Sequence, residues 1–168
     1  MAVLDRRSGG ADNFARHQPA GGRMIVRHII DTKAIKQIIT VKPTDQVKTA
    51  TEILAKHRIG AVIVSRDGDI VDGILSERDI VRALGTVGVG VLAQQVQDLM
   101  TSEVIGCHPE DTAISVMEKM TDGRFRHMPV IDANRMIGVI SIGDVVKARI
   151  TEIQQENAAL TDMISNTW

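Results

Sequence analysis

Residues 41–81 read VKPTDQVKTATEILAKHRIGAVIVSRDGDIVDGILSERDIV, and residues 107–146 read CHPEDTAISVMEKMTDGRFRHMPVIDANRMIGVISIGDVV. The second stretch repeats the first at an offset of 66 residues, which becomes 65 after the turn-rich segments 66–69 and 132–134. A hairpin turn tolerates such a change in length. The matching pairs are Pro43/Pro109, Asp45/Asp111, Glu52/Glu118, Arg58/Arg124, Val64/Val130, Gly73/Gly138, Ser76/Ser141, Asp79/Asp144 and Val81/Val146. The chain therefore contains an internal repeat, and the repeat decides the fold.

Each copy predicts the same order of elements. A short strand, at 38–41 or 104–107, ends before a proline. The pairs Thr44-Asp45 and Asp111-Thr112 then cap a helix, because such side chains accept hydrogen bonds from the free N–H groups of its first turn. The apolar stripes of these helices are Val47, Ala50, Ile53 and Leu54 in the first copy, and Ala113, Val116, Met117 and Met120 in the second.

Two further strands and a second helix complete each unit. The strands are expected at 61–65 and 70–75 in the first copy, and at 128–131 and 136–140 in the second. The second helix begins at Ser76 or Ser141. A unit of about 45 residues is too small to bury both faces of its sheet alone. We therefore expect an α+β (α/β) fold, in which two β-α-β-β-α repeats pack with pseudo-two-fold symmetry and leave two related clefts between them.

The composition supports a sheet-rich interior. There are 39 Ile and Val residues against 7 Leu, with two Phe, one Trp and no Tyr. Branched aliphatic residues pack well on sheets, whereas a helical bundle would rely on Leu. The formal net charge of −1 and the shortage of aromatic residues argue against nucleic-acid binding, which needs basic patches or base-stacking platforms.

The same counts bear on the cellular location. The single cysteine, Cys107, cannot form an internal disulfide, and the N-terminus does not resemble a secretory leader. No apolar run approaches the ~20 residues that span a bilayer. We therefore expect a cytoplasmic protein without a membrane partner.

We predict four parts along the chain. Residues 1–23 are rich in glycine and charge and lack periodic apolar positions, so we expect a disordered tail. Its basic bias is compatible with either a weak interaction arm or a merely solvated segment. Residues 24–86 form the first repeat, residues 87–150 the second, and residues 151–168 a C-terminal helical extension.

The last helix carries an apolar seam with the spacing 4-3-4-3-4. Its positions are Val146, Ile150, Ile153, Asn157, Leu160 and Ile164. This spacing is typical of a coiled coil, in which a polar residue such as Asn157 fixes the register and a two-stranded state. The alternative is an amphipathic helix that lies on its own domain. We favour the seam between two chains, and hence a homodimer, because little of this small chain is left to cover such a helix.

Both repeats contain the pattern Gly-x-x-Ser-x-x-Asp, as GILSERD at 73–79 and GVISIGD at 138–144. In a structural interpretation the serine caps the second helix, the aspartate closes a capping box, and the glycine allows close packing. In a functional interpretation the free N–H groups of the helix bind a phosphate, while the aspartate accepts both hydroxyls of a ribose. The two interpretations are compatible.

Basic residues favour a ligand, and no catalytic or metal site is evident. Arg78, Arg126 and His127 lie near strand and helix ends, and Arg or protonated His donates charge-assisted hydrogen bonds to phosphate. The five histidines show no metal-ligand spacing. No Ser-His-Asp or Cys-His arrangement is apparent. We therefore expect neither a metal nor an enzyme.

The doubled pattern closely resembles a tandem CBS-domain pair, or Bateman module. The resemblance rests on Thr40-Val41-x-Pro43, RIGAVIV and GILSERDIV, then on RFRHMPVID and GVISIGDVV, and covers residues 24–150. It is similar to the small stand-alone CBS-pair proteins, to which no catalytic domain is attached. CBS pairs also occur in inosine-monophosphate dehydrogenase, but a catalytic (β/α)₈ barrel of about 250 residues has no room in this chain.

The resemblance implies that adenosine-containing ligands such as AMP, ADP, ATP, NAD(H) or S-adenosylmethionine bind between the repeats and regulate an unknown partner protein. Asp79 and Asp144 would hold ribose hydroxyls, with Ser76 and Ser141 beside the ribose or phosphate. The family's adenine-lining positions are Ile39, Thr40, Ile59 and Ala61 in the first copy, and Ile105, Gly106 and Phe125 in the second. The phosphate-contacting positions are Arg78, Arg126 and His127.

The first copy departs from the pattern, because Gly60-Ala61 stand where the second copy has Arg126-His127. The two sites should therefore differ in their affinity for polyphosphate. The alternative function is a constitutive structural dimer or adaptor, in which the serines and aspartates act only as helix caps.

Overall fold

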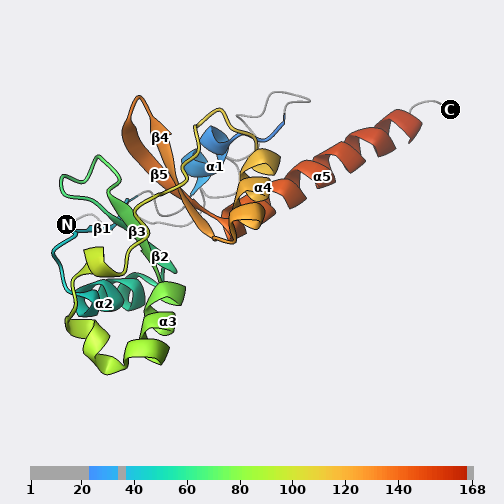
Figure 1. Ribbon diagram of the computed structural model, residues 1–168. Helices are drawn as coiled ribbons and strands as arrows, with labels where there is room; N and C mark the ends of the chain where they lie inside the picture. The colour runs from blue at the N-terminus through green and yellow to red at the C-terminus, as the bar shows by residue number, and fades with distance from the viewer. Residues whose placement is uncertain (1–22, 34–36, 166–168) are drawn as a thin grey trace, which may run out of the picture.

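The computed structural model describes residues 23–33 and 37–165 of the 168-residue chain. The tail predicted at 1–23 therefore lies, except for Arg23, outside the described residues. The described residues form two halves, each with its own sheet and its own apolar core (Figure 1). This mixed α/β architecture of two repeats and a long C-terminal helix confirms the predicted fold class.

The first half contains a three-stranded sheet in the order β1-β2-β3. Its strands are β1 (Thr40–Val41), β2 (Ala61–Val64) and β3 (Gly73–Ser76), with β1 parallel and β3 antiparallel to β2. Helices α2 (Val47–His57) and α3 (Glu77–Val87) share one apolar core with these strands. Two 3₁₀ helices, η2 (Val89–Ala93) and η3 (Val96–Asp98), lead to the second half.

The second half contains the antiparallel hairpin of β4 (His127–Asp132) and β5 (Arg135–Ser141). Helices α4 (Ala113–Gly123) and α5 (Ile142–Ser165) pack on it, together with α1 (Val26–Thr32). The core of this half is formed by buried aliphatic and Met side chains, which explains how so few aromatic residues suffice. The predicted apolar stripes of α2 and α4 lie in the two cores.

Two sequence predictions about local structure are wrong. The strand expected at 104–107 is reduced to a single parallel bridge between Cys107 and Val130; Gly106 precedes the paired residue, and Pro109, which has no N–H to donate, follows two positions later. The pair Thr44-Asp45 does not cap α2, whose N-cap is Gln46. Asp45 instead closes the preceding turn by accepting the Lys42 N–H at 2.8 Å.

In the second copy the predicted cap is present. Thr112 is the N-cap of α4, and its hydroxyl oxygen accepts the Ser115 N–H at 3.2 Å.

Helix α1 belongs to the core of the second half although it precedes the first. The N–H groups of Val26 and Arg27 donate to the carbonyl oxygens of Asp111 and Pro109, at 2.9 and 2.8 Å. Met24, Val26 and Ile29 are buried in the second core. The sequence prediction assigns residues 24–32 to the first repeat, and in the structure this segment packs on the core of the second half.

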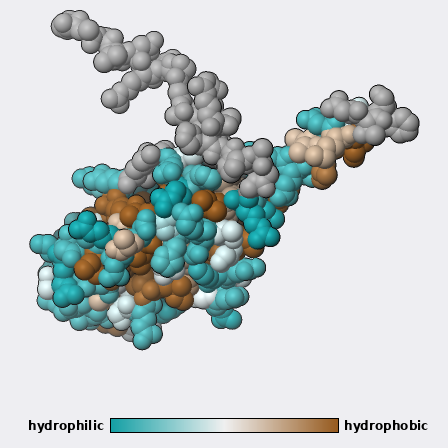
Figure 2. Space-filling view, turned by 90° about the horizontal axis from the view of Figure 1, so that it is seen from above, coloured by the Kyte–Doolittle hydropathy of each residue, from teal (hydrophilic) through white to brown (hydrophobic). Residues whose placement is uncertain are grey.

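Helix α5 begins on the second core and then leaves it. Val145, Ala148 and Glu152 are buried, whereas every described residue after Glu152 is exposed. In Figures 1 and 2 this distal part projects from the body of the molecule. Along the described ranges, no helix has the length and apolar character needed to cross a membrane.

Candidate functional site

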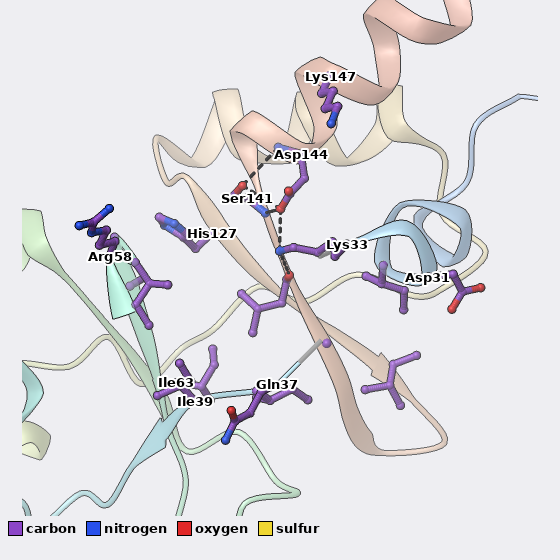
Figure 3. A pocket seen from close by; sticks show the side chains of 18 residues that line it. Asp31, Lys33, Gln37, Ile39, Arg58, Ile63, His127, Ser141, Asp144 and Lys147 are labelled. Carbon is purple, nitrogen blue, oxygen red and sulfur yellow. Dashed lines mark hydrogen bonds and ion pairs between the residues drawn. The ribbon is translucent and has the colours of Figure 1, made fainter. Parts of the chain in front are cut away.

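A cavity of about 560 Å³ lies between the two halves (Figure 3). This volume suits a small organic ligand. One wall is mainly aliphatic and comes from the first half, with Ile39 before β1, Ile59 before β2, and Ala61 and Ile63 in β2. The opposite wall comes from β5 and the start of α5, and α1 closes one side. The polar and charged residues of the lining are Asp31, Lys33, Gln37, Arg58, His127, Ser141, Asp144 and Lys147.

Ser141 and Asp144 form a capping box where β5 passes into α5. Oδ2 of Asp144 accepts the Ser141 N–H and the Ser141 hydroxyl, both at 2.8 Å, and Oγ of Ser141 accepts the Asp144 N–H at 3.2 Å. Ser76 and Asp79 form the same box at α3. The structural interpretation of the repeated motif therefore holds in both copies, and the local hydrogen bonds fix the position of each carboxylate.

Lys33 provides a third contact to the Asp144 carboxylate. Its Nζ atom lies 2.8 Å from Oδ2 of Asp144 and donates to the Val139 carbonyl oxygen at 2.9 Å (Figure 3). Burial by itself raises the pKa of Asp144, but the hydrogen bonds from Lys33 and Ser141 outweigh it and hold this pKa below its usual value. Asp144 is therefore a fixed carboxylate at neutral pH.

His127 is the first residue of β4, and its side chain lines the cavity. Burial lowers the pKa of His127 below its usual 6.5, and the nearby charge of Lys33 acts in the same direction. At pH 7 the ring is thus neutral, rather than the cation considered from the sequence. Gly60 permits this position, since a Cβ on Gly60 would come within 2.9 Å of the His127 ring. The first copy therefore has Gly60, where the second copy has Arg126, because a side chain at position 60 would clash with the His127 ring.

The structure brings together only some of the residues that the sequence singled out. The candidates that line the cavity are Ile39, Ile59, Ala61, His127, Ser141 and Asp144. The candidates that lie outside it are Thr40, Ser76, Arg78, Asp79, Ile105, Gly106, Phe125 and Arg126.

Several residues of the outside group have other contacts. The Arg78 guanidinium donates to the Arg124 carbonyl oxygen at 3.2 Å and so bridges the two halves. Phe125 packs against the core of the second half, and Ile105 is 52% exposed. Most of these residues belong to the second cleft that the sequence predicts, and they do not line the cavity described above.

Sequence reasoning missed three cationic residues of the cavity. Lys147 follows Asp144 by three residues, so helical spacing places it on the same face and was a usable signal. Arg58 has a left-handed backbone at the end of α2, as its repeat partner Arg124 has at the end of α4. The sequence shows that Arg58 and Arg124 match, but it does not show that Arg58 lines a cavity. Lys33 lies outside the repeated stretches, and no signal marked it.

The cavity does not resemble a metal site. Across residues 23–33 and 37–165, no group of three or more His, Cys, Asp or Glu side chains is arranged to hold a metal ion. Cys107 is buried in the second core, and burial raises the pKa of its thiol to about 12. A thiol with this pKa is not a nucleophile at neutral pH.

Comparison with known proteins identifies the fold. The family model of the CBS domain matches residues 26–86 and 96–151. The chain belongs to the CBS-domain family. The two matches cover both repeats, including the capping boxes and the crossing helix α1, and so confirm the resemblance found in the sequence.

Two relatives of this CBS-domain chain show the extent of the similarity. The mitochondrial CBS domain-containing protein CBSX3 of Arabidopsis thaliana is 39% identical over 128 residues, which span 74% of this chain and 62% of the Arabidopsis protein. The crystal structure of the CBS-domain containing protein ATU1752 from Agrobacterium tumefaciens is 43% identical, covers 79% of this chain and 98% of that one, and superposes with a TM-score of 0.73. Both are named only for their CBS domains, which supports the prediction that this chain is not an enzyme.

A third relative has a ligand. The CBS-domain pair of protein MJ0100 is 25% identical, covers 74% of this chain and 98% of that one, and superposes with a TM-score of 0.65. That protein was crystallised in complex with 5′-methylthioadenosine and S-adenosyl-L-methionine. Both of its ligands contain an adenosyl group.

Proposed function

We propose that this chain is a regulatory module that binds an adenosine-containing ligand in the cavity between its repeats. The observation that carries the proposal is the combination, in one cavity of suitable size, of an aliphatic wall with a fixed carboxylate at a helix start. Such a wall suits a purine ring, and a carboxylate accepts the two hydroxyls of a ribose. The adenosyl ligands of the MJ0100 pair support the same ligand class.

The described contacts suggest how the ligand is held. The adenine lies between Ile39, Ile59 and Ala61, which the resemblance also implies. The ribose lies at Asp144, whose Oδ2 atom is occupied by Ser141 and Lys33, whereas Oδ1 accepts no hydrogen bond from a described residue. Oδ1 is thus the acceptor that remains for a ribose hydroxyl.

The charges of the cavity favour a phosphorylated ligand. Arg58 and Lys147 line it, and neither forms an ion pair with a described residue. Guanidinium and ammonium groups donate strong hydrogen bonds to phosphate oxygens. We therefore propose an adenine nucleotide such as AMP, ADP, ATP or NAD(H) as the ligand.

A second, different site is part of the proposal. It lies between the Ser76/Asp79 capping box and the segment before β4, with Arg78 and Arg126 as phosphate contacts. Ile105, Gly106 and Phe125 would line its adenine pocket. Because Arg126 here replaces the Gly60 of the first site, we expect the two sites to prefer different ligands or phosphate numbers.

Binding is tested by the melting temperature of the protein with millimolar AMP, ATP or NAD(H). A ligand that binds only the folded state raises the melting temperature by mass action. We expect a rise for at least one of these ligands, and a loss of most of that rise in Asp144→Ala. The absence of any shift with every adenosyl ligand would support the alternative, a constitutive structural dimer or adaptor.

Asp111→Ala is the matched control for this experiment. The Asp111 carboxylate also accepts a turn N–H, from His108 at 3.2 Å, and also binds a lysine, Lys119, at 2.8 Å. It does not line the cavity. Both variants should therefore lose some stability, but Asp111→Ala should keep the response to ligand.

We further propose that the module is a homodimer which passes ligand occupancy to a regulated protein in the cytoplasm. Helix α5 supplies a surface for a second copy, because Ile150, Ile153, Leu160 and Ile164 are each 42% or more exposed. In a parallel pair Arg149 and Glu156 would face Gln154 and Thr161 of the second copy, so no like charges meet.

A further inference from the structure

We propose that Lys33 makes the cavity selective for adenosine ligands that carry a phosphate over those that carry none. The inference rests on the proposed function of the cavity and names the ligand class that it selects. It follows from the position of Lys33, whose ammonium group is paired with Oδ2 of the same carboxylate whose Oδ1 is left for the ribose.

The fold fixes the position of Lys33. It is the C-cap residue of α1, whose backbone is fixed to the second half by the hydrogen bonds of Val26 and Arg27. Its ammonium group lies between Oδ2 of Asp144 and the Val139 carbonyl oxygen. The Lys33 and Asp144 side chains are only 27% and 24% exposed, so water compensates poorly for the loss of either partner.

A bound ribose weakens this ion pair. Each hydroxyl that donates to the carboxylate withdraws part of its negative charge and competes for its acceptor positions. The ammonium group of Lys33 then loses part of its counter-charge inside a half-buried cavity, which costs free energy unless another anion replaces it. An adenosine without phosphate offers no such replacement.

A phosphate on the same ligand restores the balance. Its oxygens accept charge-assisted hydrogen bonds, so the ammonium group gains a second anionic partner when the first is weakened. Arg58 and Lys147 also attract phosphate, but neither is paired with the carboxylate that the ribose contacts. Lys33 is therefore the residue that converts ribose binding into a requirement for phosphate. A ligand with a positively charged sulfonium group would be disfavoured for the same reason.

The test compares the dissociation constants of AMP and adenosine by isothermal titration calorimetry. One charge-assisted hydrogen bond contributes about 1.5–3 kcal/mol, which corresponds to roughly 10- to 150-fold in affinity. We expect the wild-type chain to prefer AMP, and Lys33→Met to reduce the AMP/adenosine affinity ratio by about tenfold or more. Part of this change should be a gain in adenosine affinity, which the mere loss of a phosphate contact would not produce.

Lys119→Met is the matched control. The Nζ atom of Lys119 also lies 2.8 Å from an aspartate of the second half, Asp111, but outside the cavity. The AMP/adenosine affinity ratio of Lys119→Met should therefore equal that of the wild type. Lys33→Gln is a second variant, which keeps a donor for the Val139 carbonyl oxygen and should behave as Lys33→Met does.

The outcomes separate the two proposals. If wild type and both variants bind neither AMP nor adenosine, the proposed function fails. If they bind but the ratio of Lys33→Met and Lys33→Gln stays within twofold of the wild type, the function stands and the role of Lys33 is overturned.

Discussion

The backbone N–H of Met24 donates a hydrogen bond to Oε1 of Glu152, with 3.1 Å between nitrogen and oxygen. Glu152 is only 7% exposed, and its other carboxylate oxygen accepts a hydrogen bond from Arg149. The contact joins the start of the described chain to the last turn of α5 that is still packed on the core. It thereby holds α1, and with it Lys33, against the second repeat.

We expect Glu152→Ala to lower the free energy of unfolding by about 2–3 kcal/mol, because the buried Met24 N–H and the half-buried Arg149 both lose their acceptor. Urea unfolding followed by circular dichroism measures this loss. Glu156→Ala, one turn later and exposed, is the control and should change the stability by less than about 0.5 kcal/mol. Equal losses in the two variants would show that the contact does not stabilise the fold.

The glycines of the two repeated motifs should respond differently to alanine. A Cβ at Gly73 would lie 2.5 Å from Sδ of Met100 and 3.0 Å from the Thr101 carbonyl oxygen, whereas one at Gly138 would lie 3.4 Å from Ile30. Because overpacking against backbone costs about 1–3 kcal/mol, we expect Gly73→Ala to destabilise the protein in that range and Gly138→Ala to cost less. Thermal unfolding compares the two, and a larger loss at Gly138 would contradict this account.

Much of the fold follows from local patterns and could be predicted. The repeat, the apolar stripes of α2 and α4 and the serine caps of the second helices depend on residues a few positions apart, such as Ser76 and Asp79. The two wrong predictions, the cap at Thr44-Asp45 and the strand at 104–107, lie where neighbouring residues favour a different local structure. Asp45 can accept either a helix N–H or the Lys42 N–H, and the turn wins. The 104–107 segment has strand-forming residues, but Gly106 and Pro109 limit its pairing to Cys107.

The cavity depends on contacts that no local pattern contains. Its carboxylate, Asp144, could be predicted because the motif occurs twice. Its partner Lys33 could not, because the chain crosses from α1 to the first half before it returns to α5, and only the packing of α1 on the second core brings the two together. The neutral state of His127 likewise results from burial and from Lys33, neither of which sequence spacing reveals.

His127 should make the stability depend on pH in the mildly acidic range. Its pKa is lowered in the folded chain, by burial first and by Lys33 second, so the unfolded chain binds a proton more readily. The contribution of the neutral His127 to the free energy of unfolding is therefore complete above about pH 6.5 and is lost as the pH falls below that value. The pKa of Asp144 is lowered from 3.8, so its contribution to the free energy of unfolding is lost only below about pH 4. Asp144 therefore does not make the stability depend on pH in the mildly acidic range.

We expect the melting temperature of the wild type to fall between pH 7.5 and pH 5.0, and that of His127→Gln to fall less. Differential scanning calorimetry at both pH values measures the two slopes. Parallel slopes for the two proteins would mean that His127 is not the group responsible.

The distal part of α5 gives the last prediction. A single projecting helix of this length is marginally stable in water, and its seam of Ile153, Leu160 and Ile164 is exposed. If a second copy covers the seam, Leu160→Glu places a charge inside it and should convert a dimer into a monomer in light scattering at about 100 µM, a concentration high enough for weak pairs to form.

Ala159→Glu is the control for this variant, since Ala159 is a neighbour on the outer face of the same turn, and it should leave the dimer intact. Asn157→Leu should change the oligomeric state, because a paired Asn in a parallel seam selects two strands, whereas Leu permits others. A wild-type monomer, or a dimer that Leu160→Glu does not dissociate, would exclude α5 as the dimer interface. An unchanged dimer in Asn157→Leu alone would leave the interface in place and remove Asn157 as its determinant.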